Sequence, residues 1–307
     1  MNVNSIDENK VSRRVGVIDM GTNTFSLLIA DVYPDQFNTI FTEKIGVAIG
    51  MGGINQGFIA MPAFRRGIKA IIKFKEICDK YNVTEIKAIA TSAIRDAINS
   101  SDFTNEIFYK TNIKTKVISG SEEADLIYNG VLWCHDFEER AVIMDIGGGS
   151  TEFIFASEQG IEEKVSLNIG ISRIYQELKL KDPMSENDVK RIENWLDIHS
   201  DGYFFDKQCD VLVGASGTFE TFHEMIYKER FAGGCKAMEV SLQDISEILD
   251  WVIHSTKEER NYHPFIIPIR RKMAPISAVK TRWIMNQLLV KKIFVSPCSI
   301  KEGVLNS

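Results

Sequence analysis

Two short loops carry the residue types needed to hold a phosphate group beside a metal ion. They read DMGTNT at residues 19–24 and DIGGGSTE at residues 145–152, and in each the first residue is an acid that follows an apolar run. A loop rich in glycine lets backbone N–H groups approach phosphate oxygens, and serine and threonine hydroxyls add further donors. A tight β-turn is the other interpretation of consecutive glycines. One such loop therefore does not decide between the two.

A third loop of this kind, GASGT at residues 214–218, follows an apolar strand and precedes a predicted helix. The free N–H groups at the start of a helix favour an anion. Three such loops in one chain favour a phosphate site over coincidental turns. The predicted phosphate ligands are Gly21, Thr22, Asn23, Thr24, Gly147, Gly148, Gly149, Ser150, Thr151, Gly214, Ser216, Gly217 and Thr218.

The first two loops belong to an internal repeat. Residues 15–30 (VGVIDMGTNTFSLLIA) align with residues 141–156 (AVIMDIGGGSTEFIFA) without a gap, and the alignment places Asp19 on Asp145. An apolar run flanks each loop on both sides, so each loop is predicted to be the turn of a β-hairpin. We expect two similar halves whose loops face each other across a cleft, with a cation between the two carboxylates.

Apolar patterns and turn signals predict the remaining elements. The predicted strands are 13–19, 24–31, 38–46, 85–91 and 115–119, then 141–146, 150–156, 162–169, 209–214 and 291–296. The predicted helices are 62–82, 92–99, one starting near residue 101, 121–133, 171–179, 185–199, 218–229, one starting near residue 241, 271–289 and a short C-terminal one. This order predicts an α/β protein of two domains, residues 1–135 and 136–307.

The composition is typical of a globular protein and excludes several classes. Hydrophobic residues make up 44% and charged residues 25% of the 307, and the net charge of −6 argues against generic nucleic-acid binding. The five cysteines, among them Cys235, form no CxxC pair and are odd in number, so we expect reduced thiols and neither a disulfide framework nor a zinc site. The polar N-terminal segment is no signal peptide, and no apolar run is long enough to span a membrane. We expect a cytoplasmic protein.

Five sequence blocks carry a resemblance to a known family. The two loops and the later GxSGT motif resemble the actin, Hsp70 and sugar-kinase superfamily. Within it, the chain is similar to the exopolyphosphatase and guanosine pentaphosphate phosphohydrolase (Ppx/GppA) family. The blocks are IDMGTNTFSLLIA (18–30), ATSAIRDAIN (90–99), VISGSEEADLIYNGV (117–131), DIGGGSTEF (145–153) and GASGT (214–218), with KEGVL (301–305) near the end. The resemblance covers essentially the whole chain and matches the short, two-domain form of the family.

This resemblance implies two duplicated ribonuclease-H-like (actin-like ATPase) domains with a cleft between them. It also implies a Mg²⁺-dependent hydrolase that releases terminal phosphate from inorganic polyphosphate or converts guanosine pentaphosphate to the tetraphosphate. A kinase or ATPase of the same superfamily and a non-catalytic nucleotide-sensing protein are the alternatives. The expected partners are these phosphate substrates, with no nucleic acid and no membrane, and a homodimer is left open.

The resemblance also assigns roles to individual acids. Glu123, the second glutamate of the EEA block, is the expected general base, and hydrolysis needs such a base to take a proton from water. For Glu122 the favourable position in the first turn of a helix is explanation enough. Asp145 and Glu152 are the expected magnesium ligands, being hard carboxylates beside the glycine loop. Asp19 is expected to orient a metal-bound water.

Some residues leave two interpretations open. Arg95 is expected either to contact phosphate or to form a salt bridge within its loop. The basic tract 269–282 is either a solvated helix face or a surface that steers polyphosphate. Pro297, Cys298 and Lys301 depart from the family's usual pattern before EGVL, which puts nucleotide contact or interdomain motion at that segment in doubt.

Overall fold

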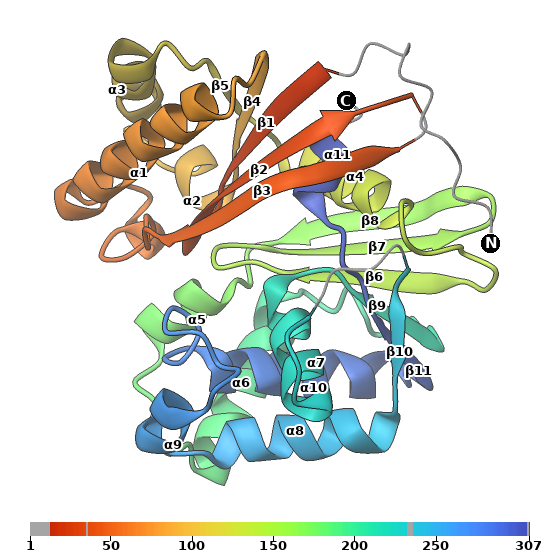
Figure 1. Cartoon of the computed structure of the whole chain (residues 1–307). Coiled ribbons are helices and arrows are strands. Elements are labelled where there is room, and N and C mark those ends of the chain that lie inside the picture. Colours follow the sequence, from red (N-terminus) through yellow and green to blue (C-terminus); the bar gives the residue numbers. More distant parts are fainter. Residues whose placement is uncertain (1–12, 35, 232–235, 306) are drawn as a thin grey trace.

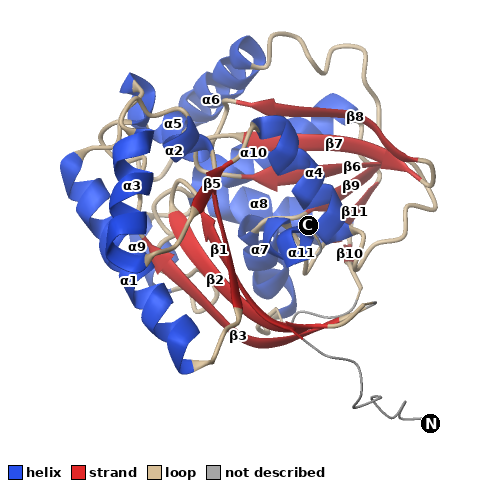
Figure 2. Cartoon of the chain, turned by 90° about the horizontal axis from the view of Figure 1, so that it is seen from above, coloured by secondary structure: helices blue, strands red, loops and turns tan. Residues whose placement is uncertain are grey.

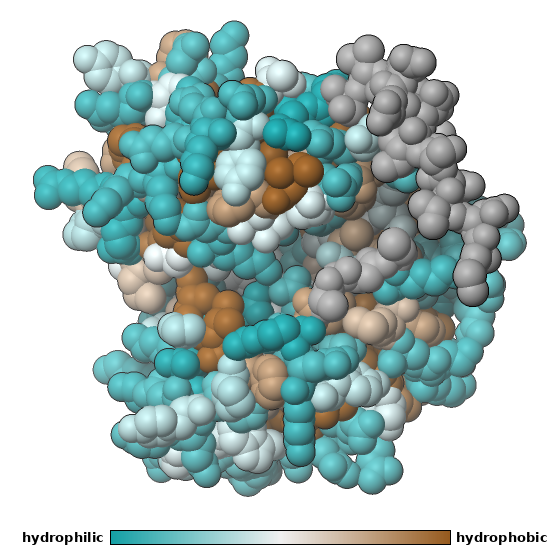
Figure 3. Space-filling view, viewed as in Figure 1, coloured by the Kyte–Doolittle hydropathy of each residue, from teal (hydrophilic) through white to brown (hydrophobic). Residues whose placement is uncertain are grey.

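A computed structural model describes residues 13–34, 36–231, 236–305 and 307 (Figure 1). The N-terminal segment 1–12 and Cys235, on which sequence predictions were made, lie outside the described residues. The four described cysteines are buried free thiols. No helix of the described residues is long and apolar enough to cross a membrane. Polar side chains cover most of the face of the molecule drawn in Figure 3, and apolar ones gather there in small groups.

The first sheet has five strands in the order β3-β2-β1-β4-β5. Strand β2 pairs antiparallel with β1 on one side and with β3 on the other, and β4 and β5 continue the sheet in parallel to β1. The strands are β1 (Arg13–Met20), β2 (Thr24–Val32), β3 (Phe37–Gly46), β4 (Glu85–Ala90) and β5 (Thr115–Val117). The helical elements of this half are η1 (Ile54–Gln56), α1 (Met61–Lys80), α2 (Ser92–Arg95), α3 (Ser100–Thr111) and α4 (Gly120–Val131).

The second sheet has six strands in the order β10-β11-β9-β6-β7-β8. It begins with the second hairpin, β6 and β7, in which Asp145 pairs directly with Glu152. The strands are β6 (Ala141–Ile146), β7 (Thr151–Ser157), β8 (Gly160–Leu167), β9 (Val211–Gly214), β10 (Met238–Val240) and β11 (Lys292–Val295). The helices are α5 (Ile171–Glu177), α6 (Glu186–His199), α7 (Gly217–Tyr227), α8 (Leu242–His254), α9 (Lys257–Tyr262), α10 (Ala274–Leu288) and α11 (Ile300–Leu305).

The strands β1 and β6 contribute side chains to cores on both faces of their sheets, because successive strand residues point to opposite sides. In β1, Ile18 packs with α1 and α3, whereas Val17 faces a core that contains α4 and α11. In β6, Val142 faces the helices of the second half, whereas Ile143 faces the core with α4 and α11. The pair α4 and α11 is therefore a helical layer shared by the two sheets, and both views of the chain draw it between them (Figures 1 and 2).

The strands divide as the internal repeat predicts, but the C-terminal helix does not stay with its own half. All strands of the first sheet lie before residue 118, and those of the second lie after residue 140. Helix α11 follows the last strand and packs against α4 and β1. Helix α11 thus packs the C-terminal end of the chain against the first sheet. The division into two domains at residue 135 stays a prediction.

Most predicted elements are confirmed, and the exceptions have simple causes. Strand β10 is too short, at three residues, to show an alternating pattern. Helix α9 (KEERNY) has no apolar stripe and begins with a capping box between Thr256 and Glu259. Helix α10 begins at Ala274 and not at residue 271, because Pro275 fits the first turn of a helix but not its interior.

Helices α4 and α11 touch through two glycines. A Cβ added to Gly303 would lie 1.8 Å from the carbonyl oxygen of Leu126, and one added to Gly130 would lie 1.8 Å from that of Ser299. Both obstacles are backbone atoms, which cannot turn away as a side chain can. The crossing of these helices therefore depends on the missing side chains.

We predict that Gly303→Ala lowers the free energy of unfolding by about 1–3 kcal/mol, because the two helices must move apart to admit the methyl group. Urea denaturation followed by circular dichroism measures it. Asn129→Ala, an exposed change on α4, is the control and should leave stability within about 0.5 kcal/mol of the wild type. Equal stability of Gly303→Ala and the wild type would contradict the close packing.

Candidate active site

A cavity of about 500 Å³ lies between the two halves, where the loops of both hairpins meet. Most of the residues predicted from the sequence line it together. They are Asp19, Gly21, Thr22, Asn23, Thr24, Glu123, Asp145, Gly147, Gly148, Gly149, Ser150, Glu152, Ser216, Gly217 and Thr218. The loops thus face each other across a cleft, as the repeat predicts.

Three predicted site residues do not line the cavity. Gly214 is a packing position, since a Cβ there would lie 2.1 Å from the ring of Phe219. Thr151 is fully buried, and its hydroxyl donates to the carbonyl oxygen of Ser150. Arg95 forms a salt bridge to Glu123 on α4, which neither of its two interpretations predicted, and a second one to the neighbouring Asp96, which agrees with a salt bridge within its loop.

The run of three glycines allows the two halves to touch. A Cβ on Gly148 would lie 2.9 Å from the side chains of Thr22 and Asn23, and one on Gly149 would lie 2.5 Å from the hydroxyl of Ser92. None of the three has a positive φ, so close approach and not backbone conformation requires glycine here. The interpretation of this stretch as a hairpin turn is correct for its shape, and the contacts explain its composition.

Helix α5 holds the glycine loop from behind. The N–H groups of Gly170, Ile171 and Ser172 donate to the carbonyl oxygens of the loop at 3.2, 3.2 and 2.8 Å. With the carbonyls turned toward α5, the N–H groups of Gly148 and Gly149 have no acceptor among the described residues. They remain available to an anion in the cavity.

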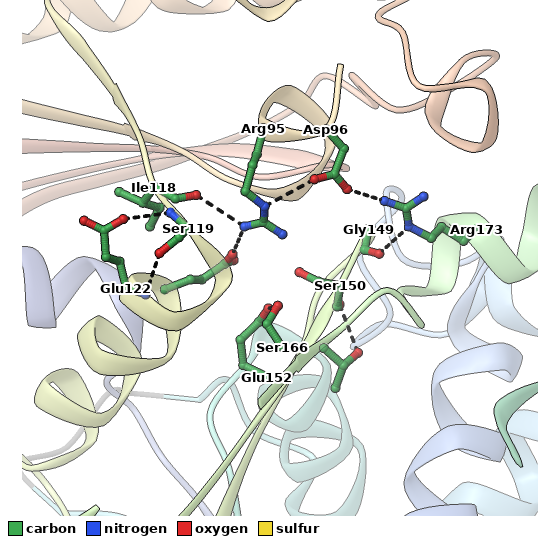
Figure 4. Close-up of polar contacts among 12 residues, drawn as sticks. Arg95, Asp96, Ile118, Ser119, Glu122, Gly149, Ser150, Glu152, Ser166 and Arg173 are labelled. Carbon is green, nitrogen blue, oxygen red and sulfur yellow. Dashed lines mark hydrogen bonds and ion pairs between the residues drawn. The ribbon is translucent and has the colours of Figure 1, made fainter. Parts of the chain in front are cut away.

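Glu123 enters the cavity from the first turn of α4. The helix begins with a capping box, in which Ser119 Oγ accepts from the N–H of Glu122 and the Glu122 carboxylate accepts from the N–H of Ser119 at 2.8 Å (Figure 4). These bonds lower the pKa of exposed Glu122 to about 2, as expected for a capping residue. The next residue, Glu123, is 7% exposed and turns inward.

Arg95 holds the Glu123 carboxylate. Its Nη1 donates to Glu123 Oε2 at 2.8 Å, and the same guanidinium lies 3.3 Å from Asp96 (Figure 4). Burial, and then the nearby charge of Glu152, raise the pKa of Glu123 well above its ordinary range, although Arg95 opposes this. A carboxyl with a raised pKa is better matched to proton transfer near neutral pH than an exposed one.

Asp145 and Glu152 lie side by side because they are register partners in β6 and β7. Burial and the charge of Glu152 raise the pKa of Asp145 to about 8, and burial also raises that of Glu152. A serine hydroxyl donates to each at 2.7 Å, Ser299 to Asp145 and Ser166 to Glu152. Glu152 is 1% exposed, so its side chain does not lie on a solvent-exposed face of β7.

This group of carboxylates suits a hard cation. Burial raises the pKa of Asp19, on the opposite hairpin, to about 6. The charge of Asp19 in turn contributes to the raised pKa of Asp145. No three acidic, histidine or cysteine side chains of the described chain are arranged as a complete metal site. Magnesium is commonly held by one or two carboxylates, with water and substrate phosphates as its other ligands. Asp145 and Glu152 fit that role.

Cations gather in another part of the cavity wall, around Glu220. Lys44 Nζ lies 3.0 Å and Arg270 Nη2 lies 3.5 Å from its carboxylate, and Lys301 also lines the cavity. Burial opposes ionisation of Glu220, but the charges of Lys44 and Arg270 outweigh it and lower the pKa to about 2. Sequence reasoning missed Lys44 and Glu220, because on β3 and α7 they look like ordinary polar positions.

The basic tract 269–282 is neither a continuous solvated face nor a basic track. Lys280 is fully buried and donates to the hydroxyl of Thr151 and the carbonyl oxygen of Ile169. Arg282 pairs with Asp250 at 3.0 Å. Of this tract, Arg270 is the cation that lines the cavity. The sequence pattern could not separate these positions, because α10 is buried on nearly all sides.

Arg173 is a further residue that no motif indicated. Its Nε donates to the carbonyl oxygen of Gly149 at 2.7 Å and its Nη2 to Asp96 at 2.6 Å (Figure 4). It thus ties the glycine loop to the short helix that carries Arg95.

The segment before EGVL also contributes to the cavity. Its lining includes Pro297, Cys298 and Lys301, the residues that the sequence resemblance marked as departures.

Comparisons with known proteins agree with this geometry. A model of the Ppx/GppA phosphatase family matches residues 28–307. A bifunctional 3-dehydroquinate synthase/phosphatase of Fusobacterium nucleatum is 36% identical over 232 residues, which cover 71% of this chain and only 35% of that longer protein. Exopolyphosphatase 1 of Mycobacterium leprae is 26% identical over 299 residues, 95% of this chain and 88% of its own.

Solved structures share the architecture of this chain. A crystal structure of an exopolyphosphatase from Cytophaga hutchinsonii superposes with a TM-score of 0.90 at 35% identity, covering 96% of this chain and 97% of that one. The Ppx/GppA enzyme of Aquifex aeolicus, at 24% identity, matches with a TM-score of 0.78 over 96% of this chain and 99% of its own and supports the fold alone. The chain therefore belongs to the Ppx/GppA phosphatase family and has the two-domain, actin-like α/β fold of that family.

Proposed function

We propose that this protein is a magnesium-dependent exopolyphosphatase, which hydrolyses the terminal phosphoanhydride bond of inorganic polyphosphate and releases phosphate. One observation carries the proposal: a buried carboxyl with a raised pKa, Glu123, shares a cavity with glycine loops whose N–H groups are free. Water attacks the terminal phosphorus, Glu123 accepts a proton from that water, and the bond to the bridging oxygen breaks. The remaining chain leaves one phosphate shorter.

Other residues of the chain have supporting roles in this proposal. The N–H groups of Gly148 and Gly149 hold oxygens of the terminal phosphoryl group, with the hydroxyls of the first loop opposite them. Asp19 orients the attacking water, and Arg95 keeps the Glu123 carboxylate directed into the cavity. Asp145 and Glu152 would hold Mg²⁺, which supplies charge neutralisation at the phosphate oxygens.

The lining of the cavity favours polyphosphate over a guanosine nucleotide as the substrate. Among its described residues the one aromatic is Phe222, which is 2% exposed and belongs to the core of the second half. The described lining thus has no further aromatic side chain that could stack on a base, whereas Lys44, Arg270 and Lys301 suit further phosphates.

The four described cysteines are free thiols, which supports a reducing, cytoplasmic location.

Phosphate release by the purified protein tests the proposal. We expect release from polyphosphate with Mg²⁺, none with EDTA, and recovery when Mg²⁺ is added in excess. Guanosine pentaphosphate, and ATP with and without sugars, are assayed in parallel. A kcat/KM on the guanosine nucleotide that exceeds the one on polyphosphate would replace the substrate, and phosphate transfer to a sugar would replace the reaction class.

Glu123→Gln is predicted to fold and bind polyphosphate but to lose about 10²–10⁴-fold in kcat, because an amide cannot accept the proton of the attacking water. The matched control is Glu122→Gln on the neighbouring residue, which retains a side chain able to close the capping box and should keep near-normal kcat. If Glu123→Gln stays within threefold of the wild type, the residue is not the base.

Asp145→Asn tests the carboxylate group through the dependence of stability on pH. Since the pKa of Asp145 rises from 3.8 to about 8 on folding, the folded protein keeps a proton that the unfolded chain gives up between about pH 4 and pH 8. Its contribution to the free energy of unfolding therefore falls as pH rises through this range. The asparagine variant has no such loss and can still accept from Ser299.

The variant should match the wild type near pH 4 and exceed it increasingly toward pH 8, measured as thermal midpoints in EDTA. At pH 8, Mg²⁺ should raise the midpoint of the wild type more than that of the variant. A difference between the two proteins that stays constant with pH would argue against the raised pKa. Equal stabilisation of both by Mg²⁺ would remove Asp145 as a ligand.

A further inference from the structure

The hydroxyl of Ser92 is buried and unpaired. The residue is 1% exposed, and its Oγ has no hydrogen-bond partner in the part of the chain that the structure describes. Buried hydroxyls are nearly always paired, since an unpaired one destabilises the fold. Thr281 and Thr111, equally buried, follow the rule and donate to backbone carbonyls one helical turn earlier. The hydroxyls of Thr115, Tyr203 and Ser216 are also buried without a partner among the described residues, and of these four residues Ser92 and Ser216 line the cavity. An unpaired hydroxyl at the cavity calls for a partner from outside the chain.

Ser92 lies where the two hairpin loops meet. It follows β4, whose Ile89 and Ala90 pair in parallel with Asp19 and Met20 of β1, so it emerges beside the first loop. From the other side, a Cβ on Gly149 would lie 2.5 Å from Ser92 Oγ and 2.7 Å from Thr22 Oγ1. Ser92 lines the cavity at this junction. Ser92 is thus in the wall of the site where the terminal phosphate is proposed to bind, with its hydroxyl against Gly149.

The short helix α2 fixes this hydroxyl relative to the proposed base. Ser92 and Arg95 are the first and last residues of α2, and Arg95 bonds Glu123 at 2.8 Å. The next residue, Asp96, accepts from Arg173, which also bonds the carbonyl oxygen of Gly149 (Figure 4). The backbone that carries Ser92 is therefore tied both to the proposed base and to the glycine loop.

We propose that Ser92 is a catalytic residue whose hydroxyl donates a hydrogen bond to a non-bridging oxygen of the phosphoryl group under attack. The proposal rests on the function proposed above. The hydroxyl keeps its proton, and no covalent intermediate forms on it, because no acceptor that could remove the proton lies within reach among the described residues. Such a bond strengthens as negative charge grows on the oxygen in the transition state.

Ser92→Ala separates this role from a structural one. Alanine removes the unpaired hydroxyl and little else, so a structural role predicts no loss of activity and equal or greater thermal stability. A donor to the phosphoryl group predicts instead a fall in kcat/KM of about 10- to 100-fold, mostly in kcat, with an unchanged or raised thermal midpoint. Ser200→Ala, at a buried serine bonded to the carbonyl oxygen of Asp197, is the control and should keep the wild-type kcat.

Calorimetric binding of inorganic phosphate gives a second readout that needs no turnover. The affinity of Ser92→Ala for phosphate should fall by roughly fivefold or more relative to the wild type. A variant that matches the wild type within threefold in kcat/KM and in phosphate affinity would overturn the proposal for Ser92. A wild-type protein without activity on any phosphoanhydride would overturn the proposed function instead, and phosphate binding alone would then decide the role of Ser92.

Discussion

The site depends on one close contact, that of the second glycine loop with the first half of the chain. Gly148 and Gly149 lie against Thr22, Asn23 and Ser92 with no space for a side chain. Three N–H groups at the start of α5 donate to the carbonyl oxygens of the loop, and the N–H groups of Gly148 and Gly149 have no acceptor among the described residues. Glycine at these two positions thus allows the two halves to touch and leaves backbone N–H groups available to an anion. A side chain here would disturb both the contact and the anion site.

Charge is divided within the cavity in a way that matches a phosphoanhydride. Asp145, Glu152 and Glu123 are buried together. Burial raises the pKa of each, and the charge of Glu152 raises those of Asp145 and Glu123 further, so the group favours a cation between phosphate and protein. Lys44 and Arg270, the cations beside Glu220, suit the next phosphates of a polyphosphate substrate. A terminal phosphate at the carboxylates and its neighbours near Glu220 would satisfy both groups.

The shared helical layer explains how a site between two sheets keeps its geometry. Glu123 lies in the first turn of α4, and Ser299, which donates to Asp145, immediately precedes α11. Because α4 and α11 cross through Gly130 and Gly303 with their backbones in contact, Glu123 from the first half and the Ser299 hydroxyl that supports Asp145 in the second are fixed to each other. A change at this crossing should therefore reach the site as well as stability.

The sequence by itself determined the repeat, most of the strands and helices along the chain and the loops with their acids, because strand periodicity and glycine-rich turns are local signals. It predicted that Glu123, Asp145 and Glu152 would meet, and the structure places them in one cavity. Only the tertiary structure decided which partners hold these acids. Arg95 became the support of Glu123 and Lys280 a buried cation because burial depends on packing between elements far apart in the chain. Ser92 had no distinguishing signal, since a hydroxyl becomes exceptional only where folding buries it without a partner.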